Sequence, residues 1–260
     1  MHSPDLHQRA PAAQPPLVWL VSGTGEGPPL AAALLQRGWQ VRVSVVSGAA
    51  ARAYAAHPAL SVAVGALGND AAVAAQLQCH PPRWVIDASH PFAQRITAQL
   101  QAACQTAAVP LLRLLRPPVA DTGERAELLA GLTALSQVDL SGQRLLLAVG
   151  ARQLREALAL SNASVHFARI LDNPLSLQLA LAAGLGDGQL ACLRPGDGSV
   201  EEALLRRWRI SAVLCRQSGG PSETLWRQLA RTHGLRLLLL QRPHDHGLST
   251  AALLEKLGAP

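Results

Sequence analysis

Lysine is almost absent from this sequence. Lys256 is the only lysine among 23 basic residues, and Tyr54 is the only tyrosine. A P-loop needs a lysine in its glycine-rich turn, a protein kinase needs one on a strand, and Schiff-base catalysis needs a buried one. The Tyr-x-x-x-Lys pair of short-chain dehydrogenases cannot form either, because Pro58 stands four residues after Tyr54. The sequence therefore argues against all four chemistries.

Aromatic residues are also scarce, at 3% of the chain, although the net charge is +6. A basic protein attracts anions, but proteins that bind single-stranded nucleic acid usually offer aromatic rings for base stacking. The arginines are dispersed and form no basic run. We therefore expect no nucleic-acid partner. The arginine surplus reflects either a genome-wide preference for arginine or a small polyanionic ligand.

The cysteines and the termini indicate a reducing compartment. Cys79, Cys104, Cys192 and Cys215 are too widely spaced for a Cys-x-x-Cys pair, so we expect free thiols, buried at Cys192 and Cys215. Residues 1–16 lack the apolar core of a signal peptide and read as a flexible extension. No run of about 18 apolar residues is present to span a membrane. We expect a cytoplasmic protein without a membrane or an obligate protein partner.

Short apolar runs alternate with helical patterns along nearly the whole chain. The expected strands are 17–22, 41–46, 61–64, 84–88, 110–114, 144–149, 164–169, 189–193, 211–215 and 236–240. Alanine- and leucine-rich helical patterns separate most of them. Apolar strands that alternate with helices are typical of parallel sheets covered on both faces. The predicted fold class is therefore α/β, with two Rossmann-like halves, mainly parallel sheets and a cleft between them.

Turn-forming residues divide this pattern into domains. We predict an NADP-binding Rossmann-like domain over 17–118, a connector over 119–139 and a second α/β domain over 140–260. A helix over 124–137 would fill the connector. The last helix, 248–257, can pack on either half and is grouped with the second domain.

A glycine-rich loop follows the first strand. The segment Ser22-Gly23-Thr24-Gly25-Glu26-Gly27 leads into an alanine-rich helix, where a close backbone approach and helix amides favour a phosphate. Gly23, Thr24, Gly25 and Glu26 are thus candidate cofactor contacts. The Gly-x-Gly-x-Gly spacing is not the complete dinucleotide fingerprint, so a turn without a ligand stays an alternative.

The end of the second strand indicates which dinucleotide would bind. NAD-binding folds usually place an acidic residue there, but no Asp or Glu occurs between Glu26 and Asp70. Ser47 and Arg52 occupy this region, with Arg42 before them. Serine and arginine accept a 2′-phosphate that a carboxylate would repel. The predicted cofactor is NADPH.

The most distinctive motif follows the fourth strand and reads Asp87-Ala88-Ser89-His90-Pro91-Phe92-Ala93. Taken locally, Asp87 or Ser89 can cap the next helix, and His90 can be an ordinary loop histidine. The whole string resembles the Asp-Ala-Thr-His-Pro-Phe-Ala signature of the precorrin-6A reductase family of corrin biosynthesis. Ser89 replaces the threonine and keeps its hydroxyl group.

Further motifs resemble the same family in the same order. They are Gly23-Thr24-x-Glu26, Val64-Gly65-x-Leu67, Arg113-x-x-Arg116-Pro117, Ala168-Arg169-Ile170-Leu171, Arg216-x-Ser218-Gly219-Gly220 and Gln241-Arg242-Pro243. Several further positions depart from the family pattern: Ala66 stands where arginine is frequent, Arg216 replaces a lysine, and Trp226 falls where a helix lysine is common. The Gly-Pro-Phe-Ser string of the second domain is reduced to Pro195-Gly196-Asp197-Gly198-Ser199. The departures weaken the assignment of individual site residues, above all in the second half.

The resemblance implies NADPH-dependent reduction of a ring double bond in precorrin-6A, or its cobalt form, to the 6B state. The substrate is a tetrapyrrole polycarboxylate, and arginines at strand ends suit carboxylate binding. His90 is a candidate proton donor, Asp87 a candidate for orienting the loop and Ser89 a candidate cofactor contact. The candidate substrate contacts are Arg113, Arg116, Arg169, Arg216, Ser218, Gly219, Gly220 and Arg242.

Two other functions fit parts of the sequence. A non-catalytic two-domain nucleotide- or small-molecule-binding protein explains the fold and the glycine loop but leaves the His-Pro-Phe-Ala string unexplained. A nucleotide-sugar transferase is also built from two such halves. We predict no metal site, because His244 and His246 form the only close histidine pair and no third ligand is evident.

Overall fold

The protein consists of two α/β units, seen in a computed structural model that describes residues 15–120, 126–163, 165–244 and 246–260. The first unit combines Met1–Leu115 with Asp245–Pro260, and the second comprises Arg116–His244. Each unit contains a sheet whose described strand pairs are all parallel, as the sequence predicted.

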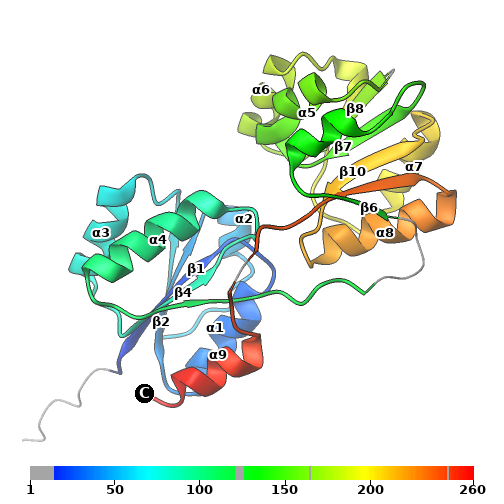
Figure 1. Ribbon diagram of the computed structural model, residues 1–260. Helices are drawn as coiled ribbons and strands as arrows, with labels where there is room; N and C mark the ends of the chain where they lie inside the picture. The colour runs from blue at the N-terminus through cyan, green and yellow to red at the C-terminus, as the bar shows by residue number, and fades with distance from the viewer. Residues whose placement is uncertain (1–14, 121–125, 164, 245) are drawn as a thin grey trace, which may run out of the picture. The chain divides into compact units, whose positions relative to one another are not determined.

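The first sheet has the strand order β3-β2-β1-β4-β5 (Figure 1). Its elements are β1 (Leu17–Ser22), α1 (Gly27–Gln36), β2 (Gln40–Val45), α2 (Gly48–Ala51), β3 (Leu60–Val64), α3 (Asp70–Cys79), β4 (Trp84–Ala88), α4 (Gln94–Thr106), β5 (Leu111–Arg113) and α9 (Thr250–Leu257). The chain leaves β1 towards β2 and later returns to β4 on its other side. The switch point, where ligands of open α/β sheets bind, therefore lies between β1 and β4.

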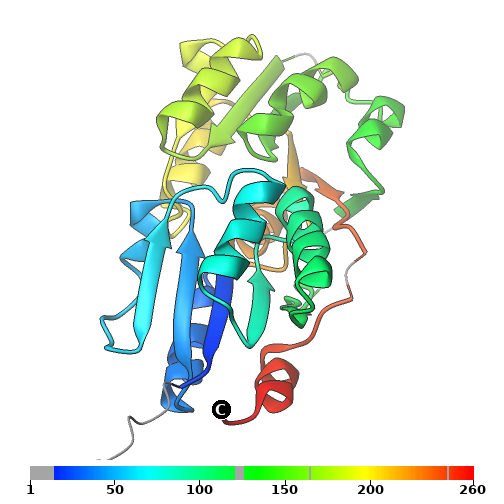
Figure 2. The same ribbon diagram turned by 90° about the vertical axis from the view of Figure 1, so that its left-hand side faces the viewer.

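The alternation of side chains along β1 builds a core on each face of this sheet. Val18 and Leu20 belong to the cluster on the α1 side, whereas Trp19 and Val21 belong to the cluster on the α3 and α4 side. Figures 1 and 2 show α3 and α4 on one face of the sheet and α1 with α9 on the other. The two layers fix where the strand-end loops emerge.

The second sheet has the order β6-β11-β10-β7-β8-β9. Its elements are β6 (Ala126–Leu129), η1 (Leu132–Gln137), β7 (Arg144–Ala148), η2 (Ala151–Gln153), α5 (Leu154–Leu160), β8 (Val165–Ile170), α6 (Pro174–Ala182), η3 (Asp187–Gln189), β9 (Leu190–Cys192), α7 (Ser199–Arg207), β10 (Ala212–Arg216), α8 (Pro221–His233) and β11 (Arg236–Leu240). The switch point of this sheet lies between β7 and β10.

The connector is the clearest difference from the predicted elements. Within the expected helix 124–137, the described part contains strand β6 and the 3₁₀ helix η1. β6 pairs in parallel with β11 and buries Leu129, so sheet hydrogen bonds outweigh the helix propensity of this alanine- and leucine-rich segment. The described residues of the predicted connector 119–139 therefore belong to the second unit.

The predicted domain boundaries differ from those of the structure at the C-terminus as well. Helix α9 belongs to the first unit, where Leu253 and Leu257 join the core beside α1. The predicted grouping of this helix with the second domain is therefore wrong, because its apolar side completes the first core. The predicted N-terminal extension, 1–16, lies almost wholly outside the described residues.

Two cysteines differ in burial from each other although both lie in strands. Cys215 is buried in the central strand β10, as predicted, whereas Cys192 is exposed at the end of the edge strand β9. The predicted burial of Cys192 is wrong because an edge strand is covered less completely than a central one.

Across the described ranges, no helix has the length and apolar character needed to cross a membrane.

Candidate active site

The glycine loop and the motif after β4 lie side by side at the switch point of the first sheet. The Gly23 N–H donates to the Ala88 carbonyl over 3.4 Å, and the Thr24 hydroxyl donates to the same oxygen over 3.2 Å. Gly25 has open space where a side chain would start. The loop ends at α1, whose first turn contains Pro28 and Pro29, residues that suit the start of a helix.

Gly27 is the glycine of this loop that the packing requires. A Cβ atom there would lie 2.0 Å from Ser22 Oγ and 2.3 Å from Tyr54 Oη. The Tyr54 hydroxyl oxygen is buried and does not reach hydrogen-bond geometry with any described residue. Burial raises the pKa of Tyr54, and the neighbouring Ser22 hydroxyl offsets part of that rise. The only tyrosine thus packs beneath the glycine loop.

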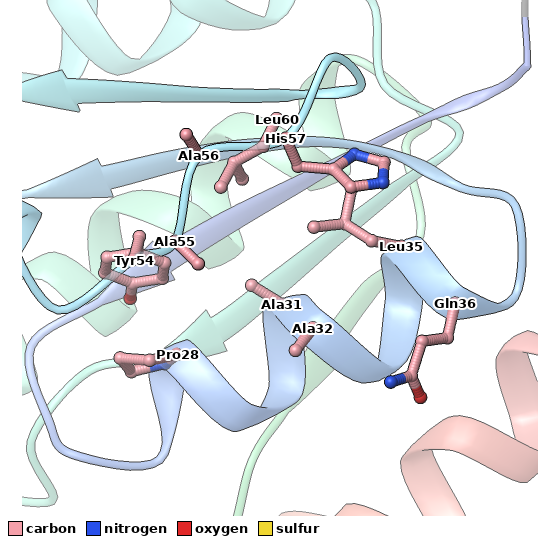
Figure 3. A pocket seen from close by; sticks show the side chains of 10 residues that line it. All are labelled: Pro28, Ala31, Ala32, Leu35, Gln36, Tyr54, Ala55, Ala56, His57 and Leu60. Carbon is pink, nitrogen blue, oxygen red and sulfur yellow. The ribbon is translucent and has the colours of Figure 1, made fainter.

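An apolar cavity of about 220 Å³ lies beside the same tyrosine. Figure 3 shows Tyr54 and Pro28 near one end of it, and Leu35 of α1 with His57, which lies between α2 and β3, near the other. Cofactor and substrate pockets are usually larger, at roughly 300–1,000 Å³. The cavity also lies along the helix flank and not at the strand ends, so we assign it no role in the site.

The end of β2 carries polar side chains of the predicted kind. The Ser47 hydroxyl accepts the Ala50 N–H over 3.2 Å, and Arg52 folds back so that its Nη1 lies 4.0 Å from a Cβ built on Gly48. Both side chains are exposed. Arg42 instead bonds the side-chain amide of Gln76 in α3. Ser47 and Arg52 therefore remain at the strand end, while Arg42 does not.

Asp87 is fully buried and binds three neighbours. Its Oδ1 accepts the Ser89 N–H over 2.9 Å and lies 2.8 Å from Arg113 Nη1, while its Oδ2 accepts the Thr97 hydroxyl over 2.7 Å. The same Arg113 nitrogen donates to Ser89 Oγ over 3.0 Å. Arg113 was expected to contact substrate, but its guanidinium lies inside this network with a side-chain exposure of 10%.

His90 follows directly in the same loop. Its Nδ1 accepts the Phe92 N–H over 3.2 Å, and the two rings lie with centroids 5.8 Å apart. While this bond persists, the neutral imidazole has its proton on Nε2 and presents an N–H donor. Proton donation by an imidazolium would first require Nδ1 to give up the Phe92 N–H. The predicted role of His90 as proton donor therefore stays a prediction.

The second unit has its own polar cluster at the switch point between β7 and β10. Arg216, the last residue of β10, donates through Nε and Nη2 to Gln153 Oε1 over 3.1 and 2.7 Å. Gly150 has φ +87°, and a Cβ there would lie 3.4 Å from Arg216 Nη2. Burial, followed by the positive charge of Arg152, lowers the pKa of Arg216 to about 10. The site therefore concentrates positive charge in a partly buried position.

The loop after β10 is supported by two further arginines. Arg116 is buried and donates to the Ser218 carbonyl over 3.4 Å, and Arg242 donates to the Arg116 carbonyl over 2.7 Å. A Cβ on Gly220 would lie 2.4 Å from Arg116 Nη1, so a side chain there would displace the Arg116 guanidinium. The predicted substrate contacts of this loop are thus brought together within one unit.

Glu223 and Arg169 take part in buried ion pairs. Glu223 accepts the Gly219 N–H over 2.8 Å and pairs with Arg227 over 2.9 Å. Arg169 pairs with Glu201 of α7 over 3.1 Å, with side-chain exposures of 14% and 4%. Arg169, which was expected to contact substrate, therefore binds a carboxylate of its own unit.

Sequence reasoning missed Thr97, Gln153 and Glu223. Each lies in a helical pattern that carries no motif, and each becomes part of a site only through a contact with a distant strand end or loop. Nothing in the position of Thr97, within the helix that follows the motif, indicates that its hydroxyl binds Asp87. Among the described residues, no group of three His, Cys, Asp or Glu side chains is placed to hold a metal ion.

The two sheets and their switch-point loops define a Rossmann-like α/β protein with polar sites at its strand ends. A family model described as precorrin-6x reductase CbiJ/CobK matches residues 17–257. The chain is 35% identical over 231 residues to the cobalt-precorrin-6A reductase of Synechocystis sp., covering 87% of this chain and 88% of that protein.

Two further relatives agree with this match. The precorrin-6A reductase of Rhodococcus erythropolis is 30% identical over 238 residues, covering 87% of this chain and 89% of that protein. A solved structure of CobK precorrin-6A reductase aligns with a TM-score of 0.71 at 26% identity, covering 94% of this chain and 98% of that one. The chain belongs to the precorrin-6x reductase family, a family of oxidoreductases. The family expected from the His-Pro-Phe-Ala string is confirmed.

Proposed function

We propose that this protein reduces a ring double bond of precorrin-6A, or of its cobalt form, to the 6B state with NADPH as the hydride donor. One observation carries the proposal: the Asp87–His90 motif contacts the glycine loop at the switch point of the first sheet. Family membership supports the reaction. It favours an enzyme over the two alternatives, a non-catalytic binding protein and a nucleotide-sugar transferase.

The residues of the first unit fit a phosphorylated dinucleotide. Gly23 and Gly25 leave the backbone accessible at the start of a ten-residue helix, α1, and Thr24 and Glu26 complete this loop. The exposed Ser47 and Arg52 side chains follow β2, and no carboxylate precedes Asp70 in this region of the sequence. This arrangement supports NADPH over NADH, since a 2′-phosphate needs a cation and not an acid beside it.

The residues of the second unit fit the carboxylates of a tetrapyrrole. Arg216, Ser218, Gly219, Gly220 and Arg242 gather around the β10–α8 loop, and Arg116 packs beneath them. We assign this loop to the acetate and propionate groups of the substrate, because guanidinium groups pair well with carboxylates. The contacts of Arg113 and Arg169 within the protein support positioning roles for these two residues in place of substrate contact.

In this proposal the protein binds NADPH and the tetrapyrrole, orients them towards each other and shields the reacting atoms from water. NADPH supplies the hydride when it is bound. Ser89 contributes a hydroxyl beside the glycine loop. The Asp87 carboxylate orients Ser89 by accepting its backbone N–H. His90 presents an Nε2–H donor from the same loop, while the proton for the neighbouring ring carbon comes from His90, from solvent or from a substrate carboxyl. Cytoplasmic localisation and the lack of a protein partner stay predictions.

The cofactor assignment is tested by removing one cation. Arg52→Gln is expected to raise the KM for NADPH by about tenfold, the loss of one charged hydrogen bond, and to leave the KM for NADH nearly unchanged. Arg83→Gln is the matched control, because it removes the same charge at the opposite end of the sheet. There the backbone N–H of Arg83, which the substitution keeps, donates to the Leu17 carbonyl. Steady-state oxidation of both cofactors with precorrin-6A measures the effect. Equal efficiency of NADPH and NADH in the unmodified enzyme contradicts the proposal.

A further inference from the structure

Thr97 makes an unusual contact for a threonine in a helix. It is the fourth residue of α4, where a threonine hydroxyl ordinarily donates to the carbonyl one turn earlier. Thr106, in the last turn of the same helix, does so, with its hydroxyl 3.0 Å from the Ala102 carbonyl. Thr97 instead donates over 2.7 Å to Oδ2 of Asp87, at the end of β4. This contact links the helix to the strand-end loop.

The Asp87 carboxylate connects Thr97 to Ser89, because it binds both residues. Thr97 occupies Oδ2, which leaves Oδ1 to accept both the Ser89 N–H and Arg113 Nη1. Asp87 is 0% exposed, so its carboxylate depends on these protein donors. A buried carboxylate that loses one such donor is strongly disfavoured and will change its orientation or its partners.

Arg113 fixes the same serine from its other side. Its Nη1 donates to the Ser89 carbonyl over 3.2 Å and to Ser89 Oγ over 3.0 Å. The backbone N–H, the carbonyl and the hydroxyl oxygen of Ser89 are therefore all bound by the Asp87–Arg113 pair. Since the guanidinium occupies a lone pair of Oγ, the hydroxyl proton must point away from Arg113.

Ser89 in turn lies against the glycine loop. A Cβ built on Gly23 would lie 3.7 Å from Ser89 Cα and 3.6 Å from the His90 nitrogen, which is ordinary van der Waals contact. The residue just before Ser89 binds the glycine loop, because the Ala88 carbonyl accepts the Gly23 N–H and the Thr24 hydroxyl. The network that holds Asp87 and Ser89 on either side of Ala88 therefore supports the position of this carbonyl and of the glycine loop.

We infer that Thr97 is a positioning residue of the cofactor site, which acts through Asp87 and together with Arg113 to fix Ser89 against the glycine loop. The inference rests on the proposed function, because the loops concerned are those assigned to NADPH. The Thr97 hydroxyl is linked to Ser89 through the Asp87 carboxylate. Its effect is on the affinity for the cofactor and not on the supply of a proton or hydride.

The test compares three variants of the full-length protein. Thr97→Val keeps the shape of the side chain and removes the hydroxyl, Thr97→Ser restores the hydroxyl, and Thr106→Val makes the same chemical change at the far end of the same helix. NADPH affinity is measured by fluorescence titration in the absence of substrate. The KM for NADPH, kcat and the free energy of unfolding are measured in parallel.

Thr97→Val is expected to raise both the Kd and the KM for NADPH by about tenfold, the effect of one hydrogen bond to a charged group. Thr97→Ser and Thr106→Val are expected to bind NADPH as the unmodified protein does. Equal NADPH binding by Thr97→Val and Thr106→Val contradicts the positioning role, as does a Thr97→Ser variant without recovery. A protein that binds no NADPH before any substitution contradicts the proposed function instead, so the two failures are distinguishable.

Discussion

A single methyl group at position 27 has no room beneath the glycine loop. The Cα atom of Gly27 faces the Ser22 and Tyr54 hydroxyls, whereas Gly25, two residues earlier, faces open space. Two glycines of one motif therefore serve different physical purposes. Gly27 is needed for packing between β1 and the α2–β3 segment, and Gly25 leaves the backbone open to a ligand.

Gly27→Ala is expected to lower the free energy of unfolding by about 1–3 kcal/mol, the usual cost of forcing extra volume into a packed site. Gly25→Ala is the matched control and is expected to change this free energy by no more than about 0.5 kcal/mol. Denaturant unfolding followed by circular dichroism measures both. Equal effects of the two substitutions would show that the packing argument is wrong.

Much of the first site was predictable at the residue scale because its motifs are local. The glycine loop and the Asp87–Ala93 string each lie within a few residues, and parallel strands bring their ends to one edge. The ion pairs of Arg113 and Arg169 were not predictable. Whether an arginine binds a ligand or a carboxylate of its own protein depends on Asp87 and Glu201, which come from distant parts of the chain.

At the scale of elements, helices α7 and α8 contain the same ion-pair spacing in different surroundings. Glu202 and Arg206 form an i,i+4 pair with side-chain exposures of 37% and 62%, whereas Glu223 and Arg227 form one with exposures of 0% and 8%. The exposed pair is screened by water. Loss of a partner in the buried pair leaves a charge without compensation and also affects the Gly219 N–H, which donates to Glu223.

Arg227→Met is therefore expected to lower the free energy of unfolding by about 3–5 kcal/mol. Arg206→Met, the same substitution in an exposed pair of the same spacing, is expected to cost less than about 1 kcal/mol. Chemical denaturation of both variants gives the comparison. A similar cost for the two would mean that the burial of the α8 pair has no energetic effect.

At the scale of the whole molecule, the stability of the first unit depends on a segment from the far end of the chain. The chain leaves the first unit after Leu115, builds the second unit and returns at Asp245 to add α9 to the first core. Leu253 is 0% exposed in that core. The stability of the first unit therefore depends on the last residues of the sequence.

Leu253→Ala is expected to destabilise the first unit by about 2–5 kcal/mol through the cavity it creates. Hydrogen exchange should become faster in β1, α1 and β4 and stay unchanged in β7 and β10. Leu205→Ala, in the core of the second unit, is the matched control and should give the reverse pattern. Faster exchange confined to the second unit in Leu253→Ala would refute this division of the chain.

The sequence by itself determined the fold class, the ten strands with strong apolar runs, the family and the loops at the ends of β1 and β4. These features depend on short-range periodicity and contiguous motifs, which a sequence displays directly. Only the tertiary structure decided that Ala126–Leu129 is a strand and that α9 completes the first core. It alone showed that Thr97 binds Asp87, because partners far apart in sequence meet only when strands and helices pack.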